Sequence, residues 1–186
     1  MPAPILSKEE VLDLLLNTFR DRGYEGASLA ELSSATGLGK SSLYHYFPGG
    51  KEEMAEQVLA YMDRQLPTNL YEPLQLEQTP EKKLGLMLDV IDAFYEGGRR
   101  ACLLERLCAS VDRTRFRRPL HDAFTAWMDA VEAICLEAGL SKATARARGE
   151  AFVVRIEGAL VVCAGTDDYS VFARTIKELR SSVLAQ

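Results

Sequence analysis

Two helix-start signals near the beginning of the chain constrain its fold more than any other feature. Ser7 followed by Glu10, and Ser28 followed by Glu31, have the spacing of a capping box, in which a serine and a glutamate side chain each accept a backbone hydrogen bond. Apolar residues then recur at helical spacing, here and in every later segment up to residue 184. No alternating apolar run bounded by turn residues indicates a strand. The sequence therefore predicts an all-α fold.

Glycines, prolines and polar cap residues divide the chain into about nine helices. We expect a small N-terminal unit, a proline-containing connector from Pro67 to Pro80, and a larger helical body after it. The predicted helices run approximately over 8–22, 28–35, 39–46, 51–65, 80–96, 100–111, 119–138, 142–164 and 169–184.

Composition excludes several classes of protein. With 22 basic and 27 acidic side chains the net charge is −5, so binding to nucleic acid would depend on a local arrangement of groups. The four cysteines include no Cys-x-x-Cys pair and there are two histidines, so we expect no metal site, no disulfide framework and no cofactor. The first ten residues do not read as a signal peptide, and no apolar run spans a bilayer. These features predict a cytoplasmic protein without a membrane partner.

The stretch Gly39-Lys40-Ser41 is similar to the second half of a phosphate-binding loop. That loop has a further glycine five residues before its second one and follows a buried strand. Here the position is Ser34, within a predicted helix. A nucleotide-binding protein or helical enzyme using Lys40 and Ser41 is therefore the alternative, and loss of nucleotide binding in Lys40→Ala would support it. A helical interaction adaptor that binds no DNA is a third hypothesis.

The same stretch fits a helix-turn-helix better. Helices at 28–35 and 39–46 are separated by a turn at Gly37, as in a motif whose second helix enters the DNA major groove. One face of the second helix carries side chains that donate hydrogen bonds to phosphates and base edges: Lys40, Ser41, Tyr44 and His45.

Residues 28–47, SLAELSSATGLGKSSLYHYF, and then Lys51-Glu52-Glu53-Met54 resemble the signature of the TetR family of transcriptional repressors. The turn Phe47-Pro-Gly-Gly-Lys51 is similar to the LmrA/YxaF-like branch. The resemblance implies phosphate contacts from Ser28, Tyr44 and Lys51, and groove-facing positions for Lys40, Ser41, Ser42 and His45. Two positions depart from the usual pattern: Tyr46 replaces a frequent histidine, and three residues instead of two separate Phe47 from Lys51.

The resemblance also implies a homodimer that binds a palindromic double-stranded DNA operator and responds to an unknown small-molecule effector. Residues 1–50 would be the DNA-binding domain, and residues 51–186 the effector-binding and dimerisation domain. Candidate pocket residues are Met87, Ile91, Phe94, Leu103, Leu107, Phe124, Trp127, Met128 and Phe152. Candidate dimer residues are Val154, Gly158, Val161, Val162, Phe172 and Ile176. The role of the arginine-rich segment 99–118 stays open.

Overall fold

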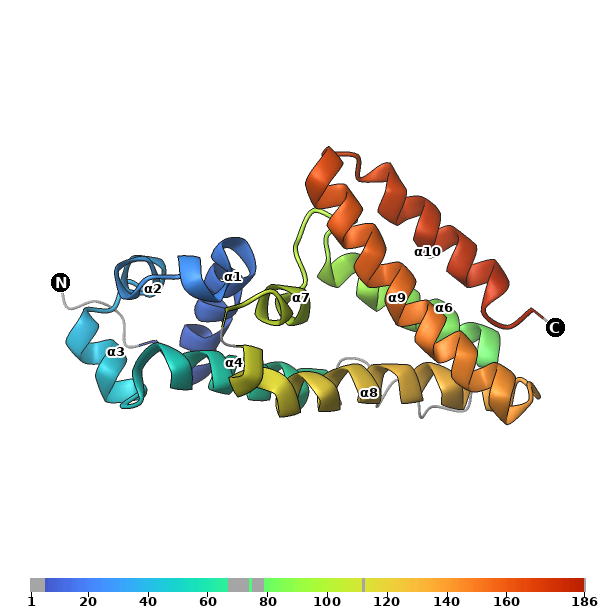
Figure 1. The fold of residues 1–186 in the computed structure, drawn as a ribbon, viewed down its shortest axis with the longest axis horizontal. Helices are drawn as coiled ribbons and strands as arrows, with labels where there is room; N and C mark the ends of the chain where they lie inside the picture. Colours follow the sequence, from blue (N-terminus) through green and yellow to red (C-terminus); the bar gives the residue numbers. More distant parts are fainter. Residues whose placement is uncertain (1–5, 67–73, 75–78, 112, 186) are drawn as a thin grey trace. The chain divides into compact units, whose positions relative to one another are not determined.

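The computed structural model describes residues 6–66, 74, 79–111 and 113–185, and the described residues form nine α-helices and no strand (Figure 1). The predicted connector, Pro67 to Pro80, lies almost entirely outside the described residues. The all-α fold and the number of helices are as the sequence predicts. The helices group into two compact units, which are described separately.

The first unit contains α1 (Lys8–Gly26), α2 (Leu29–Thr36), α3 (Lys40–Tyr46) and α4 (Gly50–Leu66), together with Leu103–Arg117. That last segment holds α7 (Leu103–Cys108) and the first turns of α8 (Arg113–Glu137). Its core is formed by side chains that are fully buried: Phe19, Leu32, Leu43, Phe47, Met54, Val58 and Leu107. The grouping of 103–117 with the N-terminal helices joins parts of the chain that are far apart in sequence.

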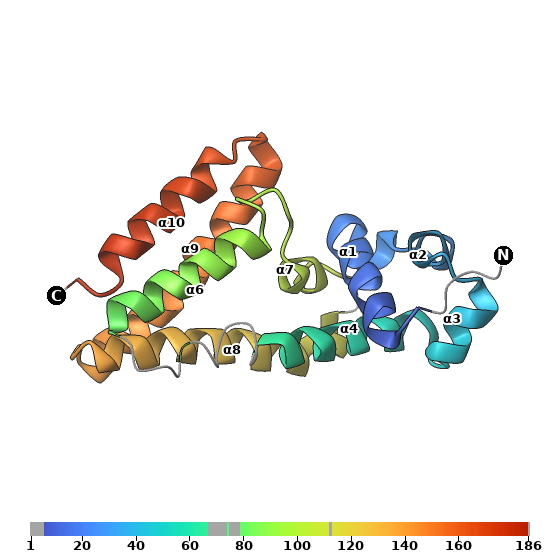
Figure 2. The ribbon, with the colours of Figure 1, turned by 180° about the vertical axis from the view of Figure 1, so that it is seen from behind.

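The second unit contains α6 (Pro80–Phe94), the rest of α8, α9 (Lys142–Thr166) and α10 (Ser170–Ser182). Figures 1 and 2 show α9 and α10 side by side and antiparallel, with α6 along the same pair. Arg148 donates to the Ser182 carbonyl oxygen at 3.0 Å, and Arg155 pairs with Glu178. These contacts fix the register of α9 against α10, over a core that includes Met87, Leu88, Phe152, Ile156 and Phe172.

Local signals explain most helix ends. Both predicted capping boxes are confirmed, with Ser7 and Glu10 at α1 and Ser28 and Glu31 at α2 exchanging hydrogen bonds of 2.7–3.2 Å. Gly23 has a φ of +68° and kinks α1, and the helix resumes to Gly26, four residues past the predicted end. The prediction that a helix begins at Pro119 is wrong. Proline prefers the first turn, but α8 begins at Arg113 and Pro119 lies inside it.

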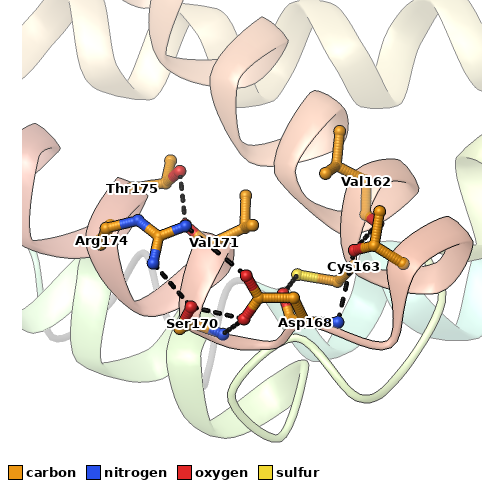
Figure 3. A network of polar contacts seen from close by, with 8 residues as sticks. Val162, Cys163, Asp168, Ser170, Val171, Arg174 and Thr175 are labelled. Carbon is orange, nitrogen blue, oxygen red and sulfur yellow. Dashed lines mark hydrogen bonds and ion pairs between the residues drawn. The ribbon is translucent and has the colours of Figure 1, made fainter.

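The turn between α9 and α10 is held by a dense polar network (Figure 3). The Asp168 carboxylate accepts hydrogen bonds from the backbone N–H and the hydroxyl of Ser170, and Arg174 lies 3.8 Å from its other oxygen. The Ser170 hydroxyl is the largest cause of the lowered pKa of Asp168. The sequence favours Asp168 as the cap of this helix, but the N-cap of α10 is Tyr169, and Asp168 instead accepts hydrogen bonds from Ser170, the first residue of the helix.

Candidate nucleic-acid interface

The turn between α2 and α3 is fixed by side chains of α2. The Thr36 hydroxyl donates to the Leu32 carbonyl oxygen at 2.8 Å, and the Ser33 hydroxyl donates to the Leu38 carbonyl oxygen at 2.5 Å. Gly37 takes a left-handed conformation, with a φ of +67°, that a glycine adopts without strain. Leu32 and Leu43, one on each helix, are fully buried. The angle between the two helices is therefore set by packing and by hydrogen bonds within the motif.

The opposite face of α3 is exposed and carries donors. Lys40, Ser41, Tyr44 and His45 all lie on the surface, and Ser42 is half-buried beside them. Tyr44 is 45% exposed although tyrosine is a large apolar side chain, and its ring passes beside Gly50. A Cβ added at Gly50 would stand 3.4 Å from the Tyr44 Cε1 atom. The turn after α3 thus lies against one edge of the Tyr44 ring, while much of the side chain stays exposed.

Ser28 is the N-cap residue of α2, the first helix of the motif. Its hydroxyl oxygen accepts the Glu31 backbone N–H at 3.2 Å, which leaves the hydroxyl proton as a donor. The reciprocal hydrogen bond from the Ser28 backbone N–H is the largest cause of the lowered pKa of Glu31, and Arg22 adds a favourable charge 3.7 Å away. Glu31 is thereby held ionised at the start of α2, where the helix dipole also favours negative charge.

Two residues near this face, Lys51 and Tyr46, donate hydrogen bonds to backbone carbonyl oxygens of the same chain. The Lys51 ammonium donates to the Tyr24 carbonyl oxygen at 2.7 Å and lies 4.5 Å from the centre of the Tyr24 ring. The Tyr46 hydroxyl donates to the Leu6 carbonyl oxygen at 3.0 Å. Both departures from the usual signature pattern therefore occur where the motif contacts α1 or the residues just before it. The sequence predicted no contact between Tyr24 and Lys51, because nothing in a lone tyrosine signals a carbonyl contact to a distant lysine.

The geometry does not suit a nucleotide-binding loop. The residues before Lys40 form a helix and a turn, and the described part of the chain contains no strand to position such a loop. The described residues also gather no group of three His, Cys, Asp or Glu side chains that could hold a metal ion. No described helix is both long and apolar enough to cross a bilayer.

The nine candidate pocket residues are divided between the two units. Leu103 and Leu107 lie on α7 in the first unit, where Arg106 donates to the Arg20 carbonyl oxygen of α1 at 3.2 Å. The other seven lie in the second unit. There the Trp127 and Phe152 rings meet edge-to-face at 6.3 Å, and the Trp127 indole nitrogen is buried without a hydrogen-bond partner. Met87 and Ile91 are buried on α6, Phe124 and Met128 are half-buried on α8, and Phe94 is 40% exposed.

The six candidate dimer residues separate by exposure. Val154, Val161 and Val162 are 69%, 52% and 45% exposed, and a Cβ at Gly158 would meet nothing within 4 Å. Phe172 and Ile176 are instead buried within the chain, so neither side chain is offered to a partner. Sequence reasoning missed the small exposed residues Ala147, Ala151 and Gly165, which extend the same face of α9 at three- and four-residue spacing.

Comparison with known families matches both parts of the chain. Residues 11–58 match the family model described as bacterial regulatory proteins, tetR family. Residues 91–178 match the model described as transcriptional regulator LmrA/YxaF-like, C-terminal domain. The chain belongs to the TetR family.

Relatives and solved structures agree with this assignment. The TetR-family chain is 24% identical over 162 residues to the HTH-type transcriptional regulator LmrA of Bacillus subtilis (strain 168), covering 84% of this chain and 85% of LmrA. It is 23% identical over 167 residues to YxaF of the same organism, covering 87% of each chain. A TetR transcriptional regulator from Legionella pneumophila has the same fold, with a TM-score of 0.85, 14% identity, and coverage of 97% of this chain and 99% of that one.

A second structural neighbour was solved with DNA. It is a cysteine mutant of the TetR family regulator CifR, complexed with 26-bp double-strand operator DNA, at a TM-score of 0.76, 19% identity, and coverage of 98% of this chain and 99% of that one. The TetR-family chain described here is a DNA-binding transcriptional regulator and not an enzyme.

Proposed function

We propose that the protein is a homodimeric repressor that binds a palindromic operator and is released from it by a small-molecule effector. The observation that carries DNA recognition is the exposed donor face of α3 on a braced helix-turn-helix. Lys40, Ser41, Ser42 and His45 would face the groove, and Ser28 and Tyr44 would hold phosphates. Residues 1–51 hold five basic and six acidic side chains, so placement of donors would contribute more to binding than net charge.

The dimer proposal rests on the exposed face of α9. Its apolar positions follow the three- and four-residue steps of a helix-packing stripe: Ala147, Ala151, Val154, Gly158, Val161, Val162 and Gly165. Small residues in such a stripe allow two helices to approach closely, and the exposed valines are costly to leave in water. A two-fold axis at this face would pair two recognition helices, as a palindromic operator requires.

The effector would bind in the second unit, among α6, α8 and α9. The buried Trp127 indole N–H supports this part of the proposal, because a buried donor is satisfied when a ligand supplies an acceptor. Release would be a population shift, in which the effector favours a spacing of the recognition helices that does not fit the operator. In this division by function, residues 1–50 read DNA and residues 51–186 bind effector and partner. We place the protein in the cytoplasm, where DNA and reduced thiols are found.

One experiment tests the recognition face. Duplexes bound by the protein are selected from random DNA, and the selection is repeated with Tyr44→Ala and His45→Ala. We expect a palindromic site for the wild type, weaker recovery with Tyr44→Ala, and a changed base preference with His45→Ala. An unchanged selection by both variants would overturn the assignment of this face. Failure of the wild type to select any duplex would overturn sequence-specific operator binding.

A further inference from the structure

The start of α4 offers two kinds of group that commonly hold a DNA phosphate. One is a lysine ammonium and the other is the set of backbone N–H groups at a helix N-terminus. The sequence places Lys51 there, one residue later than the usual signature pattern, after Pro48-Gly49-Gly50. In the structure the Lys51 ammonium and the N–H groups of Gly49 and Gly50 already have partners within the protein.

The Lys51 ammonium contacts both the carbonyl oxygen and the ring of Tyr24, and we call these two groups together the seat of Lys51. Its Nζ atom donates to the Tyr24 carbonyl oxygen at 2.7 Å and stands 4.5 Å from the centre of the same residue's ring. The side chain is half-buried. A carbonyl and an aromatic face together satisfy a cation in a partly desolvated position. Moving this ammonium to a phosphate would break both contacts.

The Glu53 carboxylate accepts a backbone hydrogen bond at the turn that precedes α4. The Gly49 backbone N–H donates to Glu53 Oε2 at 2.6 Å, and the other carboxylate oxygen of Glu53 accepts from the Gln57 side chain at 2.6 Å. A phosphate at this helix start would meet the negative charge of Glu53 before it met the N–H group. The Gly49 N–H and, through its bond to the Phe47 carbonyl oxygen, the Gly50 N–H therefore already have partners.

The position of Lys51 against Tyr24 is supported by two other helices of the first unit, α1 and α8. The Tyr24 ring stacks on Phe19 of α1 at 6.2 Å and meets Phe116 of α8 edge-to-face at 5.1 Å. Beside it, Glu52 forms an ion pair with Arg115. The residue before Lys51 is Gly50, against which the Tyr44 ring packs. A displacement of Lys51 would therefore move the support of a residue on the recognition helix.

We propose that Lys51 is a positioning residue: it fixes the start of α4 to the end of α1 through Tyr24, and it does not neutralise a DNA phosphate. Its effect on the operator passes through Gly50 to Tyr44. This inference rests on the proposed operator binding, and it reassigns a lysine for which the family resemblance implies a phosphate contact.

The dependence of operator affinity on salt distinguishes the two roles. Each phosphate contact contributes about 0.9 to the slope of log affinity against log salt concentration. For Lys51→Met we expect binding weakened by about five- to tenfold with the slope unchanged. Lys40→Met is the matched control: its charge lies on the exposed face of α3, close to the bound DNA, and its loss should lower the slope by up to about 0.9. A slope lowered by about that amount in Lys51→Met would overturn the proposal.

A double-mutant cycle with Tyr24→Leu gives a second test. Leucine keeps an apolar side chain between Phe19 and Phe116 but removes the aromatic face under the ammonium. We expect Tyr24→Leu to weaken operator binding at constant slope, and Lys51→Met to weaken it further by less than it does in the wild type, because only the bond to the residue-24 carbonyl oxygen remains to be lost. If the affinity losses of the two single variants multiplied in the double variant, Lys51 and Tyr24 would act independently, as expected for a lysine that contacts DNA directly. That result would count against the proposal.

The measurement on Tyr24→Leu alone keeps Lys51 in place, so its result does not depend on whether a Lys51 variant folds. A phosphate-binding Lys51, released from its seat, would give Tyr24→Leu an unchanged or tighter affinity. Thermal unfolding without DNA separates this inference from the proposed function. A lowered melting temperature in Lys51→Met supports the seat on Tyr24 even if no operator is bound, and an unchanged one contradicts it.

Discussion

The phenol oxygen of Tyr46 lies 3.0 Å from the carbonyl oxygen of Leu6, a residue forty positions earlier in the chain, and donates a hydrogen bond to it. This bond connects the last residue of α3 with the segment that enters α1. The Tyr46 ring also contacts the rings of His45 and Phe47, at 6.3 and 6.2 Å. For Tyr46→Phe, which keeps these ring contacts, we expect the free energy of unfolding to fall by about 1 kcal/mol in urea titrations.

Tyr44→Phe is the control for this prediction, because the Tyr44 hydroxyl is on the exposed face of the same helix. Its free energy of unfolding should stay within about 0.5 kcal/mol of the wild type. Its operator affinity should fall, since a phosphate would lose a donor. Equal losses of stability in the two variants would show that the Tyr46 bond to Leu6 does not stabilise the fold.

Gly98 should tolerate no side chain. Its φ is +90°, and a Cβ atom there would stand 2.7 Å from the Cβ of Phe172 on α10. Gly139 has a similar φ of +86° but nothing within 4 Å of an added Cβ. We therefore expect Gly139→Ala to cost about 1–2 kcal/mol from backbone strain alone. For Gly98→Ala we expect the free energy of unfolding to fall by about 1–3 kcal/mol more, because the added Cβ overpacks against Phe172. Equal losses for the two variants in denaturant titrations would contradict the close approach of Gly98 and Phe172.

Acid should weaken the fold partly through Glu31. Its pKa is lowered from the ordinary value of 4.5, chiefly by the hydrogen bond from the Ser28 backbone N–H. A depressed carboxyl pKa contributes stability above 4.5 that is lost as the pH falls through the folded-state value. Glu31→Gln keeps an acceptor for Ser28 but does not titrate, so its free energy of unfolding should fall less steeply below pH 4.5. Identical pH profiles in chemical denaturation would exclude this contribution.

The exposed stripe of α9 predicts the assembly state. Val154→Asp or Val161→Asp would place a charge in the proposed helix contact, and we expect sedimentation to show a monomer for each where the wild type is a dimer. Operator affinity should then fall by about a hundredfold or more, because two recognition helices no longer act together. Ala126→Asp, at an exposed position of α8, should leave the dimer intact. A dimeric Val154→Asp, Val161→Asp double variant would overturn this interface.

One thiol should react before the others. Cys108 is exposed at the end of α7, whereas Cys102, Cys135 and Cys163 are buried. Burial also raises the pKa of Cys135, which further lowers its fraction of reactive thiolate. In the folded protein a thiol-specific reagent should therefore modify one cysteine in the fast phase, and Cys108→Ser should remove that phase. A fast phase of two or more thiols would show that the α6–α7 or α9 region opens readily.

Local chemistry made much of this fold predictable. Ser28 and Glu31 act on each other within one turn, so their spacing in the sequence was enough to locate α2. The same is true of Gly37 and of Ser141, whose hydroxyl accepts the Thr144 backbone N–H at the start of α9. The exposed face of α3 followed from helical periodicity once its ends were known.

Contacts between distant segments were not predictable in this way. Nothing near Lys51 in the sequence points to Tyr24, and nothing in residues 103–117 indicates that they pack with the N-terminal helices. The family resemblance implies a dimer interface on the last two long helices and so favours Phe172 as a contact, but the choice between core and partner depends on which side of α10 packs within the chain. Such choices are made by tertiary packing and not by the helical period.

The inclusion of residues 103–117 in the first unit has a practical consequence for building hybrid regulators. Phe116 against Tyr24, Arg115 with Glu52, and the Val111 backbone N–H on Glu25 would all be lost if the chain were joined to a foreign sensor immediately after α4. A graft that carries only the first 65 residues would lose part of the packing that supports its own helix-turn-helix. Hybrids should therefore transplant two separate stretches of sequence, even though a single crossover point looks sufficient on the linear chain.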